Sequence, residues 1–203
     1  MYISLSSKYA GNACAIAQSI INYVGKNKTQ FFDWLVCSLK SINEVLEGKE
    51  ILFEENYIYP NPLNTTSINF KNFHLLTSHH DINVVEENSI KEITEKYKRR
   101  YNRLIENINN ETNIFFIRYC KDNNDIEENE INNFYENIIR INNNLNFHFI
   151  LVSDYDNINI SENLLLKKNF KYINLKDFYN DDIINEKDDY CKTIKSYKCI
   201  YEK

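Results

Sequence analysis

Short apolar runs alternate with amphipathic segments in the second half of the chain, and this alternation limits the fold more than any other feature. Runs typical of buried strands lie at 114–119 and 147–153, and a further strand pattern lies at 172–175. Helical patterns over 128–141 and 164–168 separate them. Strands joined by helical crossovers form parallel sheets, because the right-handed connection packs back onto the sheet. The sequence therefore predicts an α/β fold, a three-layer domain with a mostly parallel sheet flanked by helices.

The first half of the chain extends this architecture. Residues 2–5 form a short strand pattern that we expect to join the sheet. Asn12 is a favourable N-cap for a first helix, and apolar residues at helical spacing predict a second helix over 31–46. A strand is expected at 73–76, and Ser89 begins a long helix with a capping-box pattern.

The bulk composition fits one globular domain over residues 1–203, with a core of ordinary size. Hydrophobic residues make up 43% of the chain, which is a composition of folded rather than disordered proteins. The charged stretch 181–203 is expected either to pack as an edge strand or to form a loose tail. Asparagine, isoleucine and lysine are abundant, which is typical of AT-rich genomes such as those of giant DNA viruses or some protists.

Charge and cysteine usage exclude several classes of function. The net charge of −5 argues against general nucleic-acid binding, because that affinity comes from surplus lysine and arginine that neutralise phosphates. The first residues lack the basic start and apolar region of a secretory signal, and no stretch approaches the roughly 18 apolar residues of a membrane span. The five cysteines are widely spread and include no Cys-x-x-Cys pair, which favours reduced thiols. We therefore expect a cytoplasmic protein that binds no membrane.

A thiol, an imidazole and a carboxylate could form a catalytic group. Cys14 falls near the start of the first predicted helix, where the helix dipole favours a thiolate. His80 would be the general base, and Asp81 or another acid would orient its ring. The alternatives are a Cys14 buried on an apolar stripe and a histidine in a solvated loop. His79, His80 and Asp81 make a poor metal site because neighbouring residues rarely share one tetrahedral centre, so no metal or cofactor is expected.

Several basic side chains could instead bind an anion. Arg100 and Arg103 share one flank of the long predicted helix, and Arg118 ends a predicted strand, where parallel sheets bind ligands. Three guanidiniums could clamp a phosphate or carboxylate. Asn12 and Asp33 complete the candidate ligand-binding residues. The alternative is a solvated flank whose arginines pair with nearby glutamates.

Several short motifs follow one another within residues 2–153. In chain order they are Ser4-Leu5-Ser6, Cys14, Phe32-Asp33-Trp34, His80-Asp81, Tyr97 to Arg103 and Phe116-Ile117-Arg118. This order resembles the family described as putative papain-like cysteine peptidases of unknown function. Its members begin with a strand reading Ser-Leu-Gly and a Cys that opens a helix, and then have a Pro-Phe-Asp-Trp segment, a His-Asp pair, a basic Lys-x-x-Arg-Arg-x-x-Arg helix and a strand ending in Arg. The resemblance implies that Cys14 is the nucleophile and His80 the base.

Three departures from this pattern leave other functions open. Ser6 stands at the glycine position, Cys14 falls several residues late, and Phe31 replaces the proline. The predicted alternation of strands and helices is also more typical of nucleotide or sugar-nucleotide binding than of proteolysis. One hypothesis is a Cys–His hydrolase or acyl transferase that acts on a small anionic or peptide-like substrate. The others are a transferase-like domain that binds a phosphate or nucleotide-sugar through the arginine cluster, and a catalytically decayed interaction protein.

Overall fold

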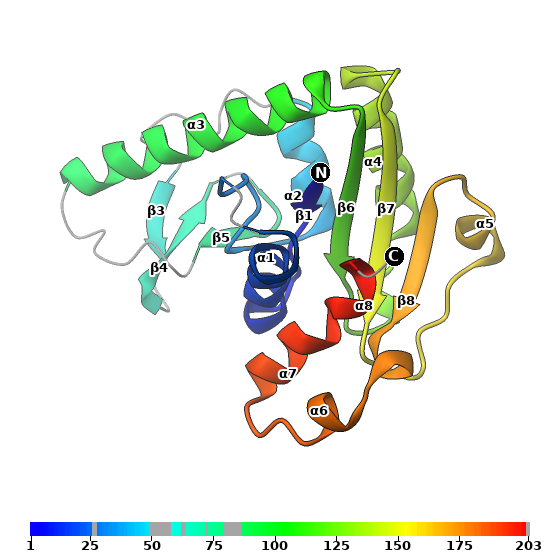
Figure 1. The fold of residues 1–203 in the computed structure, drawn as a ribbon. Helices are drawn as coiled ribbons and strands as arrows, with labels where there is room; N and C mark the ends of the chain where they lie inside the picture. The colour runs from blue at the N-terminus through cyan, green and yellow to red at the C-terminus, as the bar shows by residue number, and fades with distance from the viewer. Residues whose placement is uncertain (26–27, 49–57, 62–63, 72, 79–86, 202–203) are drawn as a thin grey trace.

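A computed structural model describes residues 1–25, 28–48, 58–61, 64–71, 73–78 and 87–201. Within these residues a parallel sheet and an antiparallel sheet lie side by side, with helices around them (Figure 1). None of the helices in these ranges combines the length and the apolar character that a bilayer crossing requires.

The parallel sheet confirms the predicted α/β architecture. Its strands are β1 (Tyr2–Ser4), β6 (Asn113–Tyr119), β7 (Asn146–Ser153) and β8 (Phe170–Asn174). They lie in the order β1-β6-β7-β8, and every neighbouring pair is parallel. The carboxyl ends of all four strands therefore meet at one edge of the sheet, which we call the carboxyl edge.

Helices cover both faces of this sheet, which gives the predicted three layers (Figure 1). Successive side chains of β6 point to opposite faces, as in any strand. Ile117 packs in one apolar cluster with Ile16, and Phe116 packs on the other side against Phe134, with ring centroids 5.1 Å apart. These two partners come from α1 (Ala10–Val24) and α4 (Glu128–Ile141).

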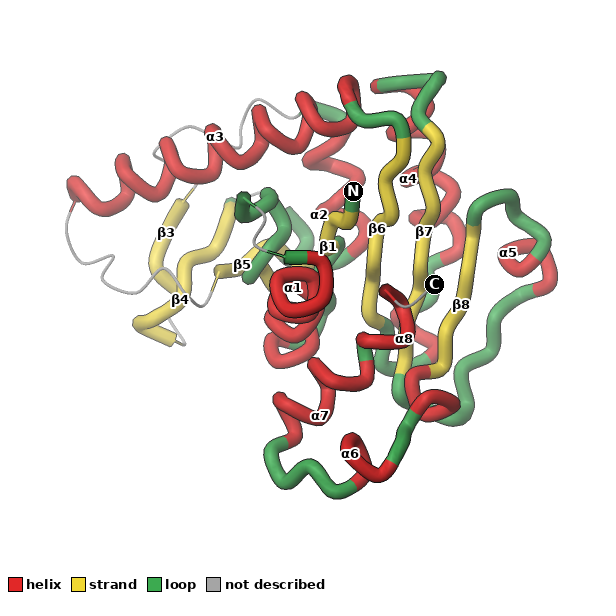
Figure 2. Tube along the Cα trace, in the orientation of Figure 1, coloured by secondary structure: helices red, strands yellow, loops and turns green. Residues whose placement is uncertain are grey.

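The second sheet is antiparallel and stands beside the first (Figure 2). In the order β2-β5-β4-β3, its strands are β2 (Leu35–Cys37), β5 (Leu76–Ser78), β4 (Asn64–Phe70) and β3 (Ile58–Asn61). A parallel bridge between Ser7 and Val36 joins the two sheets, and the backbone N–H of Cys37 donates to Ser7 O at 2.9 Å. We call this junction the seam.

The helix predicted over 31–46 is wrong in its first half. Residues 35–37 form β2, and only α2 (Leu39–Leu46) is helical. Trp34 has a φ of 68°, a left-handed conformation that ends any helical path before β2. Ser38 then caps α2, because its side chain accepts from the backbone N–H of Ser41 at 3.1 Å. Apolar residues on both sides of this break are buried in the core. Their spacing therefore looked like one continuous helix in the sequence.

Two further boundaries differ from the sequence predictions. The long helix α3 (Glu87–Asn110) already contains Ser89, so Ser89 is not its N-cap. The strand predicted at 73–76 lies later, as β5, because its residues 76–78 pair with β2 and β4. Pairing partners from distant parts of the chain decide the limits of such a strand, and a local pattern does not contain them.

The C-terminal segment is neither an edge strand nor a loose tail. It folds back on α1 as helices, and Tyr197 is fully buried there. The hydroxyls of Tyr201 and Ser19 lie 2.8 Å apart. The remaining short helices are η3 (Asn123–Asp125), α5 (Glu162–Leu165), η4 (Leu175–Phe178), α6 (Asp181–Ile184), α7 (Asp189–Ser196) and α8 (Lys198–Tyr201).

Candidate functional site

Cys14 lies in the second turn of α1 rather than at its opening. The helix begins at Ala10 with Tyr9 as its N-cap, so the prediction that Asn12 caps it is wrong. The side chain of Cys14 is only 6% exposed, and burial raises the pKa of its thiol to about 11. At neutral pH such a thiol stays protonated, whereas a cysteine nucleophile must form a thiolate.

The predicted base and its partner, His80 and Asp81, lie outside the described residues, as does His79. The described chain stops at Ser78, the last residue of β5, and resumes at Glu87, the first residue of α3.

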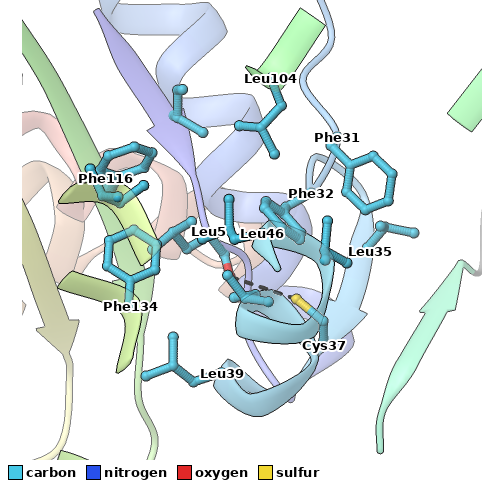
Figure 3. Close-up of a cluster of buried hydrophobic side chains, with 14 of the residues drawn as sticks. Leu5, Phe31, Phe32, Leu35, Cys37, Leu39, Leu46, Leu104, Phe116 and Phe134 are labelled. Atoms are coloured by element: carbon cyan, nitrogen blue, oxygen red, sulfur yellow. Dashed lines mark hydrogen bonds between the residues drawn. The ribbon is translucent and has the colours of Figure 1, made fainter. Parts of the chain in front are cut away.

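Arg118 is buried at the seam, with only 2% of its surface exposed. Its Nη1 donates to Leu5 O at 2.8 Å and lies 3.9 Å from Cys37 Sγ. The thiol of Cys37 also donates to Leu5 O, at 3.7 Å (Figure 3). Ser6 adopts a φ of 61°, a region that favours glycine, and this turn leads the chain out of β1 towards β2. Arg118 therefore satisfies a carbonyl that the turn leaves outside the strand ladder.

Asp33 and two arginines of α3 form a separate group. Asp33 accepts the backbone N–H of Gln30 at 2.8 Å, and the guanidinium of Arg103 donates to Thr29 O. Burial raises the pKa of Asp33 to about 6, although this bond and the charges of Arg100 and Arg103 lower it. Arg103 and Arg118 donate to different main-chain carbonyls, those of Thr29 and Leu5, and among the described residues the two side chains share no hydrogen-bond partner.

A hollow of about 540 Å³ opens at the carboxyl edge of the parallel sheet. Its lining comes from the start of α1, from the residues at or just after the ends of β6, β7 and β8, and from α7. These lining residues are Tyr9, Asn12, Tyr119, Lys121, Asp154, Tyr155, Lys176, Tyr179, Lys192 and Thr193. Ligand sites of α/β proteins occupy this edge, and the volume is typical of them. Asn12 is the one predicted ligand-binding residue among the described ones that lines it.

Two lysines of the hollow lie against tyrosine rings. Lys121 Nζ is 4.9 Å from the ring centre of Tyr9 and 5.9 Å from that of Tyr155, while Lys192 Nζ is 5.3 Å from that of Tyr179. Such contacts hold an ammonium group without cancelling its charge. Within the described part of the chain neither lysine pairs with a carboxylate, so both keep a positive charge available to an anion.

Lys176 and Asp154, two other charged groups of the hollow, already have partners. Lys176 lies 2.7 Å from a carboxylate oxygen of Asp156. The hydroxyl of Tyr119 donates to Asp154 at 2.5 Å, and burial together with this carboxylate raises the pKa of Tyr119. Tyr119 therefore remains a protonated donor at neutral pH and holds Asp154 in place at the edge of the hollow.

Sequence reasoning missed most of this lining, although part of it carried a signal. Tyr119, Lys121 and Asp154 end or closely follow strands that the sequence predicted, where ligand sites of parallel sheets lie. The lysine and threonine of α7 had no such signal, because their position depends on how the C-terminal segment packs on α1.

These features define a three-layer α/β protein with a polar, cation-bearing hollow at its carboxyl edge. Residues 1–157 match the model of a family described as Putative papain-like cysteine peptidase (DUF1796), and the chain belongs to that family. The search of curated proteins and the search of solved structures each found no significant match. Among the described residues no group of three or more histidine, cysteine, aspartate or glutamate side chains is arranged to hold a metal ion.

Proposed function

We propose that this family member binds a small phosphate-bearing ligand in the hollow at the carboxyl edge. The observation that carries the proposal is the pair Lys121 and Lys192, two ammonium groups without carboxylate partners in the described residues, both lining one hollow. Ammonium groups bind phosphates through charge-assisted hydrogen bonds. The ligand would be a nucleotide, a nucleotide-sugar or a sugar phosphate, all of which suit a hollow of about 540 Å³.

Tyr9 supports a function that does not use a thiol in this hollow. The resemblance implies a cysteine that opens the first helix, whereas here the helix begins at Ala10, directly after its N-cap Tyr9, and the ring of Tyr9 lines the hollow. Cys14, one helical turn further on, is buried and protonated at neutral pH. The described lining of the hollow contains no cysteine.

Thermal unfolding in the presence of nucleotides, nucleotide-sugars and sugar phosphates tests the proposal. A ligand at about 100 times its Kd stabilises the native state by about 2.7 kcal/mol, which raises Tm by several degrees in a chain of this size. We expect Lys121→Met to reduce the affinity for the best ligand by about tenfold or more. Lys171→Met, which removes an exposed lysine of β8 outside the hollow, is the matched control and should bind like the wild type. If none of these phosphates shifts Tm, the proposal is wrong.

Family membership favours a second candidate, a Cys–His hydrolase or acyl transferase with Cys14 as nucleophile and His80 as base. Its test is activity-based profiling with a thiol-reactive acyl probe, followed by Cys14→Ser and His80→Ala. Loss of labelling in both variants would support it. Labelling that survives Cys14→Ser would reject it, and if phosphate binding also failed, the interaction-protein hypothesis would remain.

A further inference from the structure

We infer that the ligand carries two linked phosphates, one bound by Lys121 and the other by Lys192; this inference rests on the proposed function. The two lysines reach the hollow from different elements. Lys121 follows β6 at the carboxyl edge, whereas Lys192 belongs to α7 in the C-terminal segment. Helix α7 packs on α1 and contacts η4, and its Lys192 and Thr193 form a second wall of the hollow.

The contacts with tyrosine rings hold the two ammonium groups on different walls of the hollow. Lys121 lies over Tyr9, at the start of α1, whereas Lys192 lies over Tyr179, which follows η4. Each lysine acts as a compact point charge that suits one phosphate, rather than as a fork that grips two oxygens of the same group. Lys176, the third lysine of the hollow, already pairs with Asp156. Two separate cationic positions in one hollow therefore favour a diphosphate over a single phosphate.

The second wall is firmly packed, so Lys192 is well placed to act as a binding residue. Ile194 and Tyr197 are buried against the rest of the apolar cluster on the α1 face of the sheet. The ring of Tyr201 stacks on Tyr23 at 5.7 Å between centroids, and its hydroxyl lies 2.8 Å from that of Ser19. Because these contacts hold α7 and the adjoining α8 in place before any ligand arrives, binding costs little ordering free energy.

This wall also lies outside the part of the chain that matches the family model. The match ends at residue 157, while Lys176, Tyr179, Lys192 and Thr193 all follow it. The family region thus supplies the position for the first phosphate, and the C-terminal segment supplies the position for the second. We infer that Lys192 determines the preference of this chain for diphosphates.

Isothermal titration with inorganic pyrophosphate and inorganic phosphate tests this division. The wild type should bind pyrophosphate about tenfold or more tightly than phosphate, since one more charged contact forms. Lys192→Met should lose most of that preference, because its affinity for pyrophosphate should fall towards its affinity for phosphate. Lys192→Arg, which keeps the charge, should retain the preference, and Lys171→Met should match the wild type. Thermal unfolding without ligand checks that every variant is folded.

The outcomes separate this inference from the proposed function. If the wild type binds neither anion, nor any phosphate ester in the thermal screen, the proposed function fails and the inference fails with it. If the wild type binds phosphates but Lys192→Met keeps the full pyrophosphate preference, only the inference is overturned. Equal affinity of the wild type for phosphate and pyrophosphate would also overturn it.

Discussion

The seam between the two sheets and the hollow at the carboxyl edge both hold cations, and they use them in opposite ways. At the seam, Arg118 is buried and donates to the main-chain carbonyl of Leu5. At the hollow, Lys121 and Lys192 are only partly buried and lie on tyrosine rings, without a carboxylate partner in the described residues. The strand β6 and the loop after it supply both Arg118 and Lys121, three residues apart.

The difference shows that the accessibility of a cation decides its role more than its place in a motif. Arg118 belongs to the motif order that resembles the family, yet its described contacts hold the junction of β1 and β2 together. Lys121 belongs to no motif, yet its charge faces a hollow of ligand size. A buried guanidinium that bonds to main chain contributes to stability, whereas a partly buried ammonium without a carboxylate partner can contribute to binding.

The largest effect is expected from Arg118→Ala. The substitution leaves a cavity at the seam and removes the strongest donor to Leu5 O, so it should lower the free energy of unfolding by about 3 kcal/mol. Chemical denaturation measures this loss. Ligand binding by the folded variant at low temperature should stay within about threefold of the wild type. An unchanged denaturation midpoint, or a loss of binding without a loss of stability, would break the comparison.

Thiol labelling sharpens the comparison next. Cys37 is fully buried at the seam, and burial raises the pKa of its thiol, whereas Cys191 is exposed on α7. We expect an alkylating reagent at neutral pH to modify Cys191 roughly a hundredfold faster than Cys37 or Cys14. Mass spectrometry of a time course identifies the modified residues. Fast modification of Cys14 would instead support the nucleophile hypothesis.

Asp33 extends the comparison to a third region, where the cations Arg100 and Arg103 lie near a carboxyl group. Its pKa is about 6 in the folded protein, above its ordinary value of 3.8. Between these two pH values the folded state keeps a proton that the unfolded state has released. The stability that this proton contributes is therefore present below about pH 4 and is lost as the pH rises through this window. Asp33→Asn, whose amide oxygen still accepts from Gln30, should remove the dependence and raise stability at pH 7 by roughly 2 kcal/mol. Denaturation at pH 4 and pH 7 measures both effects; a wild type that becomes more stable between them would contradict this account of Asp33.

The smallest effect on stability is expected from Lys121→Met. The ammonium makes no ion pair in the described residues, so the free energy of unfolding should change by less than about 0.5 kcal/mol. The thermal shift produced by a phosphate ligand at about 100 times its wild-type Kd should nevertheless fall to about half or less, because the affinity falls by about tenfold or more. A strong loss of stability would mean that Lys121 is structural, as Arg118 is, and that the contrast between the two regions is false.

Local patterns predicted the parallel sheet well. The strands at 114–119 and 147–153 and the helix over 128–141 were confirmed, because continuous apolar runs and a helical stripe report burial directly. The strand β2 of the second sheet was missed, because the backbone turn at Trp34 and the pairing of β2 with β5 depend on distant residues.

The candidate site was less predictable than the fold. The sequence directed attention to residue types in motifs, such as Cys14 and Arg118, but not to their burial. Asp154 and Lys121 could have been found from the rule that ligands bind beyond the ends of parallel strands. Lys192 could not, because only the packing of the C-terminal segment on α1 brings it to the hollow.

A crystal structure of the wild type grown with pyrophosphate tests the central claim most directly. The account predicts density for the anion in the hollow, with Lys121 Nζ and Lys192 Nζ each within about 3 Å of an oxygen from a different phosphate group. Pyrophosphate bound away from both lysines, or a hollow that stays empty at saturating ligand, would contradict it.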